Sequence, residues 1–512
     1  MKYVGKALSV LFSRTVLVSL FILAQIGALV MAISMFSDYF VYFYAFCELI
    51  SIIVVLSIVN TDREPGFKIA WIIPILLFPV FGGLGYLLLG GTGLSKRVRR
   101  RLHRLEVRQC EVLDPERGRC DFSSQGEGAE RLHRYMEEKV HYPAFPEEGS
   151  RYYPVGDDVT DDLLSDLRHA ERYIFLEYFI IGEGELWSSI LAVLQERARA
   201  GVDVRVLYDD IGCLRTLHAG YPRKLSAMGI QCRVFSRFVP RLSIRMNNRD
   251  HRKFCIVDGK TAYTGGMNLA DEYINRKERF GHWKDSVVRV QGGAAWSMTV
   301  QFLTMWDYVT GGETDYLPFR PAPEKREQKD GGFALPYSDS PLDRETVAAN
   351  LYIGLIARAK EYVYLTTPYL IPSESLNTAL CSAAKCGIDV RIITPHIPDK
   401  KITYEATRAH YMRLLRSGVK IYEYTPGFIH AKNFVTDDTH AVVGTVNLDY
   451  RSMYLHFEDA VWFCGGSIPG AVRDDFLETL RSCEQVDIER SRRHSRGRKL
   501  LRAVLRVFSP LL

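Results

Sequence analysis

Three long apolar runs occupy the amino-terminal part of the chain. They span residues 15–36, 39–59 and 69–90, and the first contains no charged side chain. A helix needs about 20 apolar residues to cross the hydrocarbon core of a bilayer, so each run is long enough to be a membrane segment. The first run is too long, and lacks the small-residue cleavage site, for a cleaved signal peptide. Residues 1–95 are therefore predicted to form a membrane region.

The topology of this region stays open at the level of sequence. Basic residues precede the first run, and a denser basic cluster at residues 96–101 follows the third, so both ends carry a cytoplasmic signal. Three full spans would place these ends on opposite sides. Either the denser cluster dominates, or one segment is a re-entrant or interfacial hairpin, for which the third run, broken by Pro74 and Pro79, is the best candidate. In both cases we expect a multi-pass protein of the cell membrane whose remaining chain is cytoplasmic.

The rest of the chain contains one hydrophobic pattern twice. Each copy has a strand-like run, a helical pattern and a second strand-like run. The first copy lies at residues 170–179, 186–199 and 201–207, and the second at residues 359–368, 376–385 and 387–393. Strands that alternate with helices are typical of α/β layers. The repeat predicts duplicated α/β/α domains with mixed or parallel sheets behind a helical membrane region.

The same patterns predict the domain boundaries. With 512 residues the chain exceeds the roughly 250–300 residues at which a single core stops growing. Residues 311–343 are rich in glycine, proline and charge and are interpreted as a linker between the halves. The remaining predicted segments are a connector at 96–150 with a short helix near 129–140, a first domain at 151–310, a second at 344–485, and a basic amphipathic tail at 486–512.

Charge and cysteine content change this picture only slightly. The formal net charge of +6 names no partner by itself, but basic residues gather at 96–104 and 490–506, where they could meet anionic membrane lipid. The tail has apolar residues at helical spacing among its arginines, which fits a helix on an anionic leaflet, and also fits a solvated or intramolecular helix. The ten cysteines form no metal-binding or disulfide pattern and are expected to be reduced thiols on the cytoplasmic side.

Each half also contains a His-x-Lys motif with the same spacing to a later aspartate and to a Gly-x-x-Asn sequence. Histidine and lysine two residues apart on a strand face the same side, so both can meet one ligand. The motif residues are His251, Lys253, Asp258 and Asn268 in the first half, and His430, Lys432, Asp437 and Asn447 in the second.

These paired motifs resemble the HKD motifs of the phospholipase D superfamily, and their surroundings are similar to bacterial cardiolipin synthases over most of the chain. The similar stretches are residues 248–253, 268–273, 281–285, 367–369 and 447–452, together with the hydrophobic amino-terminal region. One position differs, since His456 stands where the resemblance implies asparagine. Two intact motifs at matched spacing in one chain argue against a nuclease with one motif per chain and against a non-catalytic membrane scaffold.

Two histidines suit phosphodiester exchange because the reaction needs a neutral imidazole to attack phosphorus and an imidazolium to protonate the departing alcohol. Lys253 and Lys432 would stabilise charge on the phosphate oxygens, so no metal or other cofactor is required. Asp258 and Asp437 are expected to orient a histidine, in their own half or in the other. The resemblance implies a phosphohistidine intermediate with His251 as the nucleophile and His430 as acid and then base.

The candidate substrate-binding residues are Asn268, Asn447, Glu272 and Glu458. The resemblance implies that one phosphatidylglycerol donates its phosphatidyl group and a second accepts it, giving cardiolipin and glycerol. Another alcohol or water could be the acceptor with the same mechanism. No nucleic-acid partner is expected, and the oligomeric state stays open.

Overall fold

The computed structural model describes residues 20, 23–31, 39–90, 96–118, 120–237, 248–322, 331–342, 345–489 and 495–511. The chain divides into two compact units. One contains residues 1–93, 238–246 and 507–512, and the other contains residues 94–237 and 247–506. We call them the anchor unit and the catalytic unit and describe each by itself.

The described part of the anchor unit is built mainly from three apolar helices that contact one another, α3 (Phe40–Val59), α4 (Pro65–Leu77) and α5 (Pro79–Leu89). Within the described residues, α3 is the helix that is long and apolar enough to cross a membrane, and most of its side chains are exposed. The third predicted run is broken at Phe78, where Pro79 starts a new helix as predicted, whereas Pro74 lies inside α4 and does not end it. Most of the first run, 15–36, lies outside the described residues, although residues 23–31 are helical.

The first half of the catalytic unit forms a seven-stranded mixed sheet in the order β2-β9-β7-β6-β3-β4-β5. Strands β3, β4 and β5 are parallel, whereas β6 runs antiparallel to β3. The strands are β2 (Arg151–Tyr153), β3 (Tyr173–Tyr178), β4 (Asp203–Asp209), β5 (Gln231–Phe235), β6 (Lys253–Val257), β7 (Thr261–Gly265) and β9 (Val287–Gln291). The helices are α8 (Thr160–Arg168), α9 (Glu185–Arg199), α10 (Asp210–Cys213), α11 (Tyr221–Ser226) and α12 (Gly293–Thr310).

The second half repeats this order within a nine-stranded sheet, β1-β10-β17-β16-β15-β11-β12-β13-β18. Its core strands are β11 (Tyr362–Thr366), β12 (Asp389–Pro395), β13 (Lys420–Tyr424), β15 (Asn433–Thr436), β16 (His440–Gly444) and β17 (Glu458–Cys464). Beyond these strands the sheet continues with β10 (Phe333–Asp339) and the edge strand β1 (Phe145–Pro146) on one side, and with the edge strand β18 (Cys483–Gln485) on the other. Its helices are α13 (Val347–Arg358), α14 (Glu374–Lys385), α15 (Lys401–Arg416), α16 (Tyr450–Tyr454) and α17 (Ile468–Leu480). The duplicated mixed α/β fold is therefore confirmed.

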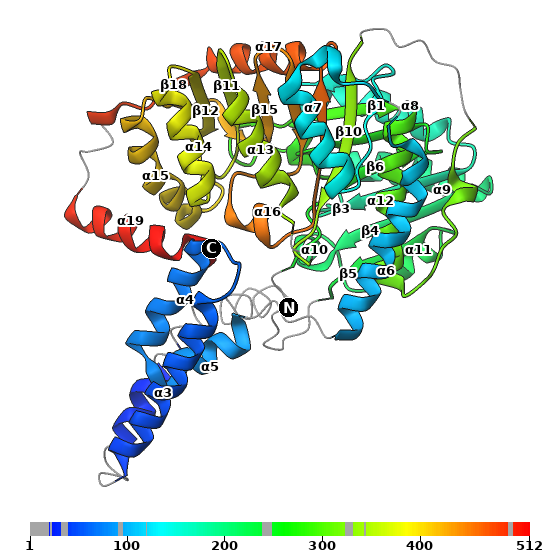
Figure 1. Ribbon diagram of the computed structural model, residues 1–512. Coiled ribbons are helices and arrows are strands. Elements are labelled where there is room, and N and C mark those ends of the chain that lie inside the picture. Colours follow the sequence, from blue (N-terminus) through cyan, green and yellow to red (C-terminus); the bar gives the residue numbers. More distant parts are fainter. Residues whose placement is uncertain are drawn as a thin grey trace. The chain divides into compact units, whose positions relative to one another are not determined.

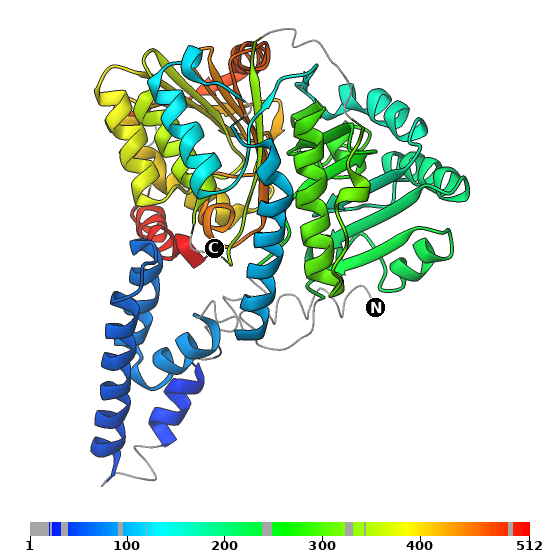
Figure 2. The ribbon, with the colours of Figure 1, turned by 45° about the vertical axis from the view of Figure 1, so that its right-hand side comes forward.

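Alternating side chains let each sheet bury both faces. In β3, Tyr173 and Phe175 pack into a core between the two sheets that also contains α12 and α17, whereas Ile174 and Leu176 pack against α8, α9 and α11. The outer face of the nine-stranded sheet packs against α13, α14 and α15. Figure 1 labels these helices, and Figure 2 shows the same ribbon from a second side, with α12 between the two sheets. The two halves thus share one central core.

The connector and linker are more ordered than the sequence predicts. The connector contains a long helix, α6 (Lys96–Leu113), and the expected short helix, α7 (Glu127–Arg134), which continues as a turn of π-helix (Tyr135–Lys139). The interpretation of 311–343 as a linker is wrong for Phe333–Asp339, because these seven residues form β10 and pair with the whole of β17. The glycine and proline residues on both sides of β10 made the whole segment resemble a linker in composition.

A short parallel strand pair joins the two halves. Strand β8 (His282–Lys284) of the first half pairs with β14 (Gly427–Ile429) of the second. A side chain at Gly427 would collide with the backbone of His282. The glycine therefore lets the two strands approach, and each strand leads directly into a site residue described below.

We expect Gly427→Ala to weaken this contact between halves and lower the free energy of unfolding by about 1–3 kcal/mol, the usual cost of overpacking. Thermal unfolding of the purified protein measures it. Gly470→Ala is the matched control, because a β-carbon at Gly470, inside α17, would meet nothing within 4 Å. Equal stability of the two variants would contradict the close approach at β8 and β14.

Candidate active site

The two motif histidines lie at equivalent places in the two halves. His251 stands just before β6, and His430 stands between β14 and β15. Both are buried, with 7% of each residue exposed. Burial of two imidazoles with little access for water is unusual unless a ligand or a protein group satisfies them.

Each histidine is held by a carboxylate from the opposite half. The Nδ1 of His251 lies 2.8 Å from Glu458 Oε2, and the Nδ1 of His430 lies 2.6 Å from Asp285 Oδ2. Both carboxylates are fully buried. A carboxylate on Nδ1 fixes the ring orientation and the tautomer, which leaves Nε2 as the nitrogen available for chemistry. The two halves therefore complete each other's site.

Backbone hydrogen bonds between halves reinforce these pairs. The His251 N–H donates to the Phe457 carbonyl at 2.9 Å, and the Phe457 N–H donates to the Arg249 carbonyl at 2.8 Å. In the other pair, the His430 N–H donates to the Lys284 carbonyl at 2.7 Å. Each histidine is thus joined through its backbone to the residue that precedes its carboxylate partner.

The residue after the motif glycine differs between halves and supports each carboxylate differently. In the second half, the hydroxyl of Thr445 donates to Glu458 Oε2 at 2.5 Å. In the first half, this position is Gly266, and a β-carbon there would collide with the carboxylate of Asp285. Asp285 is instead held by the backbone N–H of Ser286 at 2.9 Å.

Both motif lysines are fully buried beside the histidines. The Lys253 Nζ donates to the His251 carbonyl at 2.6 Å, and Lys432 makes the equivalent bond to the His430 carbonyl. An ammonium group has three donors, so each lysine keeps donors for a bound anion. Burial lowers the pKa of Lys253 to about 8 against the opposing effect of Glu458, and lowers that of Lys432 to about 7 against Asp285.

The charges of each motif set affect the pKa values of the other set. Burial lowers the pKa of His251 well below its usual value, and the charges of Lys253, Lys432 and His430 lower it further. Burial and then Lys432 lower the pKa of His430 to about 4, although Asp285 opposes them. In the free protein both rings are therefore neutral near pH 7, and a bound phosphate anion would favour protonation of one of them.

The motif aspartates do not contact the histidines, so the prediction that Asp258 and Asp437 orient them is wrong. Asp258 accepts hydrogen bonds from the backbone N–H groups of residues 171–173 at 2.8–2.9 Å, and Asp437 accepts from those of residues 360–362 at 2.8–3.0 Å. Both have positive φ, 54° and 53°, at the turn that ends their strand. They stabilise the start of the neighbouring strands, β3 and β11.

The predicted substrate-binding residues differ in their surroundings. The Asn268 Oδ1 accepts from the Ile180 N–H at 2.9 Å and its Nδ2 donates to the Tyr273 hydroxyl at 2.8 Å, so its amide is used inside the protein. Asn447 is buried, and its Oδ1 has no hydrogen-bond partner among the described residues. Of the two asparagines, Asn447 is therefore the one with a free acceptor for a ligand.

The two glutamates in that prediction take other roles. Glu272 pairs with the partly exposed Arg279 at 2.7 Å and has no contact with either histidine among the described residues. Glu458 is the partner of His251, so it orients a catalytic group. Glu272 thus has no described link to the histidines, whereas Glu458 orients His251 through Oε2 and keeps Oε1 without a hydrogen bond among the described residues.

A third histidine lies beside this pair. The His456 ring is 5.7 Å from the His251 ring, and its Nδ1 is 3.6 Å from Glu458 Oε1. Neither ring nitrogen of His456 has a hydrogen-bond partner in the described part of the chain. Ligand atoms of His251, His456 and Glu458 all lie within 4.8 Å of one another, so this trio has the donor chemistry of a zinc site. Phosphoryl exchange by two histidines and two lysines needs no ion there.

Sequence reasoning missed Asp285, although the repeat contained the signal. Asp285 lies two residues before β9 and Glu458 is the first residue of β17, and each of these strands pairs with the second strand of its motif hairpin, β7 or β16. Alignment of the two halves beyond the Gly-x-x-Asn sequence would have paired these two carboxylates. The exchange between halves could not have been found this way, because it depends on how the two sheets pack.

The comparisons with known proteins agree with this site. The family described as "Cardiolipin synthase, PLD-like domain" matches residues 163–288 and 352–479, and "Phospholipase_D-nuclease N-terminal" matches residues 49–91. A cardiolipin synthase of Geobacillus kaustophilus is 34% identical over 91% of this chain and 92% of its own length. The chain belongs to the cardiolipin synthase family. It is a phosphatidyltransferase of the phospholipase D superfamily.

Two further similarities extend this result. An uncharacterized protein of Streptococcus mutans serotype c is 39% identical to this chain. The match covers 90% of this chain and 99% of the Streptococcus protein. The crystal structure of a phosphatidylserine synthase of Haemophilus influenzae has a TM-score of 0.57 at 12% identity, and the match covers 75% of this chain and all of that one. At this identity the second similarity concerns the fold alone.

The two kinds of carboxylate predict different mutant behaviour. Asp258→Asn replaces one of the two acceptor oxygens that hold three backbone N–H groups, so we expect the free energy of unfolding to fall by roughly 1–3 kcal/mol while the folded enzyme keeps a near-normal kcat. Asp285→Asn should keep the fold but lower kcat by roughly 100- to 10,000-fold, because His430 loses its orienting charge. Thermal unfolding and turnover at low temperature separate the two effects. A catalytic loss in stable Asp258→Asn protein would contradict the structural role.

The buried lysines predict an alkaline limit to activity. We expect kcat/KM to fall as pH rises through about 7–8, because Lys432 and then Lys253 lose the charge that holds the phosphate. Unfolded lysines keep their protons to about 10.5, so over the same range the fold should gain stability. Between about pH 7 and 8, below the value of about 9 at which thiols of the unfolded chain ionise, activity should therefore fall without a matching fall in melting temperature. A parallel fall of both would mean that unfolding causes the loss.

Proposed function

We propose that the protein joins two phosphatidylglycerol molecules into cardiolipin and releases glycerol through a phosphohistidine intermediate. The observation that carries this proposal is the exchange of carboxylates between halves. It anchors both histidines through Nδ1 and leaves two Nε2 atoms and two buried ammonium groups for one phosphodiester.

In the first step, the Nε2 of His251 attacks the phosphorus of the donor lipid. The bond between phosphorus and the glycerol oxygen breaks, and that oxygen takes the proton of His430. Lys253 and Lys432 stabilise the negative charge on the other phosphate oxygens. Glu458 stabilises the positive charge that develops on His251, and Asp285 does the same for His430 while it is protonated.

In the second step, the now neutral His430 removes the proton from a hydroxyl of the second phosphatidylglycerol. That oxygen attacks phosphorus, and the bond to His251 breaks. This leaves His251 neutral and His430 as the imidazolium, the protonation state from which the first step began with the phosphate bound. The order of the two histidines follows the family resemblance, because the geometry of the two pairs is nearly symmetric.

Transfer to an alcohol must be faster than hydrolysis. Both histidines and both lysines are at most 7% exposed, which restricts bulk water at the site. Asn447, with its unpaired acceptor, is our candidate for binding an incoming hydroxyl. The same machinery with another alcohol, or with water, would give a different phospholipid or phosphatidic acid.

For the location of the reaction, we propose a multi-pass anchor with the catalytic unit on the cytoplasmic side. The apolar helix α3 supports membrane anchoring, and the match of residues 49–91 to an amino-terminal family segment agrees with it. Helix α6, which starts the catalytic unit, begins Lys96-Arg97-Val98-Arg99-Arg100-Arg101. Such a basic cluster next to a membrane segment favours the cytoplasmic side.

Lipid analysis tests the proposed reaction. Expression in a bacterium without cardiolipin should restore cardiolipin, and purified enzyme with labelled phosphatidylglycerol should release glycerol. His251→Ala should abolish both the product and the labelled covalent intermediate. His430→Ala should lower turnover by roughly a thousandfold or more, as for other acid–base residues of a covalent mechanism, while residual covalent labelling survives.

His169→Ala is the control, because this exposed histidine at the end of α8 bonds only to a local carbonyl among the described groups. It should keep full activity. Abundant phosphatidic acid without cardiolipin would reject the lipid acceptor and retain the mechanism. Covalent labelling that persists in His251→Ala and disappears in His430→Ala would reverse the order of the histidines.

A further inference from the structure

The last helix, α19 (Arg496–Phe508), carries an exposed apolar stripe. Leu500, Leu501 and Val504 lie on one face at helical spacing. Their exposed fractions are 68%, 48% and 46%. Full burial of such side chains is normally worth about 1.5–3 kcal/mol each, so a stripe of three exposed to water is unfavourable without a partner.

The opposite, polar face of α19 points toward the catalytic unit. The Arg502 Nε donates to Glu405 Oε2 on α15 at 2.8 Å, and the Arg498 Nε lies 3.8 Å from Glu405 Oε1. Only 12% of the Arg502 side chain is exposed. A helix of a soluble domain normally packs its apolar face inward and its charged face outward. Between Arg498 and Val504 the arrangement is the reverse, because the arginines contact α15 and the apolar stripe is exposed, whereas Leu505 and Phe508 are half-buried.

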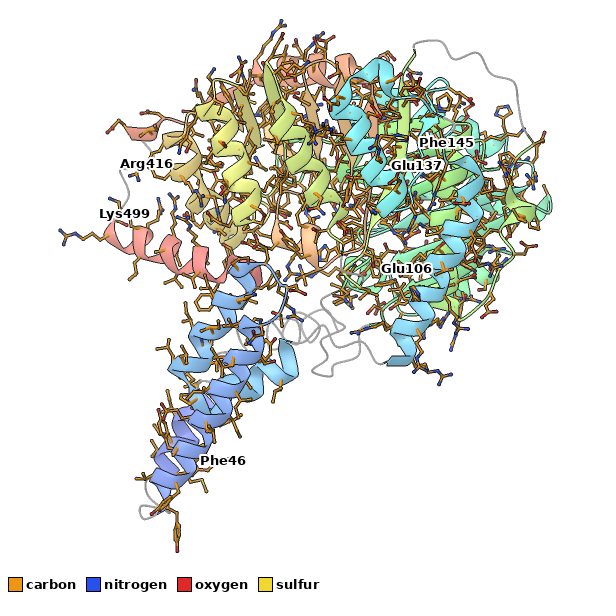
Figure 3. All side chains as sticks on the ribbon, in the orientation of Figure 1. Phe46, Glu106, Glu137, Phe145, Arg416 and Lys499 are labelled. Carbon is orange, nitrogen blue, oxygen red and sulfur yellow. The ribbon has the colours of Figure 1, made fainter. Side chains whose placement is uncertain are left out.

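The charge of α19 indicates the chemistry of that partner. The helix contains four arginines and Lys499 and no carboxylate, and Glu405 pairs with only two of these cations. Figure 3 labels Lys499, whose side chain extends away from the helix. An apolar stripe flanked by cations matches the surface of an anionic bilayer, where leucines enter the boundary of the acyl chains and cations meet the phosphates.

The residues that follow α19 add an independent argument. Within the anchor unit, Ser509–Leu511 contact α4, and Ser509 and Pro510 are buried. The carboxyl-terminal end of α19 is therefore covalently next to a segment that packs on the membrane anchor. This continuity favours a lipid partner over a soluble protein.

We propose that α19 lies in the surface of an anionic bilayer, with Leu500, Leu501 and Val504 inserted at the boundary between headgroups and acyl chains. The ion pairs of Arg498 and Arg502 with Glu405 hold the helix with this stripe outward. The contact is separate from the span of α3 and from the catalytic chemistry, so it does not rest on the proposed function.

Site-specific photocrosslinking of the full-length protein tests the proposal. The photoreactive residue p-benzoylphenylalanine replaces Leu501, and the protein is reconstituted in vesicles of phosphatidylcholine with or without phosphatidylglycerol. We expect lipid adducts at position 501, detected by mass spectrometry, and several-fold more of them with phosphatidylglycerol. An unchanged melting temperature establishes that the variant is folded.

The matched control places the same residue at Leu477, an exposed leucine of α17 without a basic, apolar stripe. It should give few lipid adducts in either vesicle. Adducts with a second copy of the protein at position 501, or lipid adducts no more abundant than at 477, would overturn the proposal. Equal lipid labelling in both vesicle types would overturn its anionic component.

Discussion

The active site depends on hydrogen bonds between each histidine and a carboxylate of the other half. His251 needs Glu458, and His430 needs Asp285. These bonds exist only when the two sheets pack on their shared core around α12 and α17. The site is therefore complete only when the two halves are packed together, and backbone contacts such as the pairing of β8 with β14 align them.

The same arrangement places two lysines, two histidines and two carboxylates in a site with little access for water. The two lysines and two histidines compete for protons there. Burial lowers all four pKa values, and repulsion by neighbouring cations lowers those of His251, His430 and Lys432 further. The carboxylates reduce this effect without removing it. Burial would raise the pKa of Asp285, but His430 and Lys432 outweigh it and keep that carboxyl ionised. A substrate phosphate brings the missing negative charge, so binding and protonation of the site are coupled.

Much of the fold could be predicted from the sequence because its signals are local. The repeated strand-helix-strand patterns, the break at Pro79 and the basic tail helix each follow from neighbouring residues. The strand β10 could not, because its seven residues gain their order from pairing with β17, far along the chain. The site residues also fall into a group that local sequence predicts and a group that depends on contacts between distant elements. Spacing alone found His251, Lys253, His430 and Lys432, whereas the roles of Asp258 and Asp285 depend on which elements meet in space. Asp258 lies in the motif yet serves a turn, and Asp285 lies outside it yet holds a histidine.

The short strands β1 and β2 have a practical consequence for truncation. They are separated by only four residues, 147–150, yet β1 extends the sheet of the second half beside β10, and β2 extends that of the first half beside β9. Helix α6, further upstream, lies along α12 in the central core. A soluble fragment that starts at the first repeat would lack β1 and β2, which extend the two sheets. The loss of β1 would expose the edge of β10. A water-soluble form suited to crystallisation should therefore begin near residue 96, directly after the anchor.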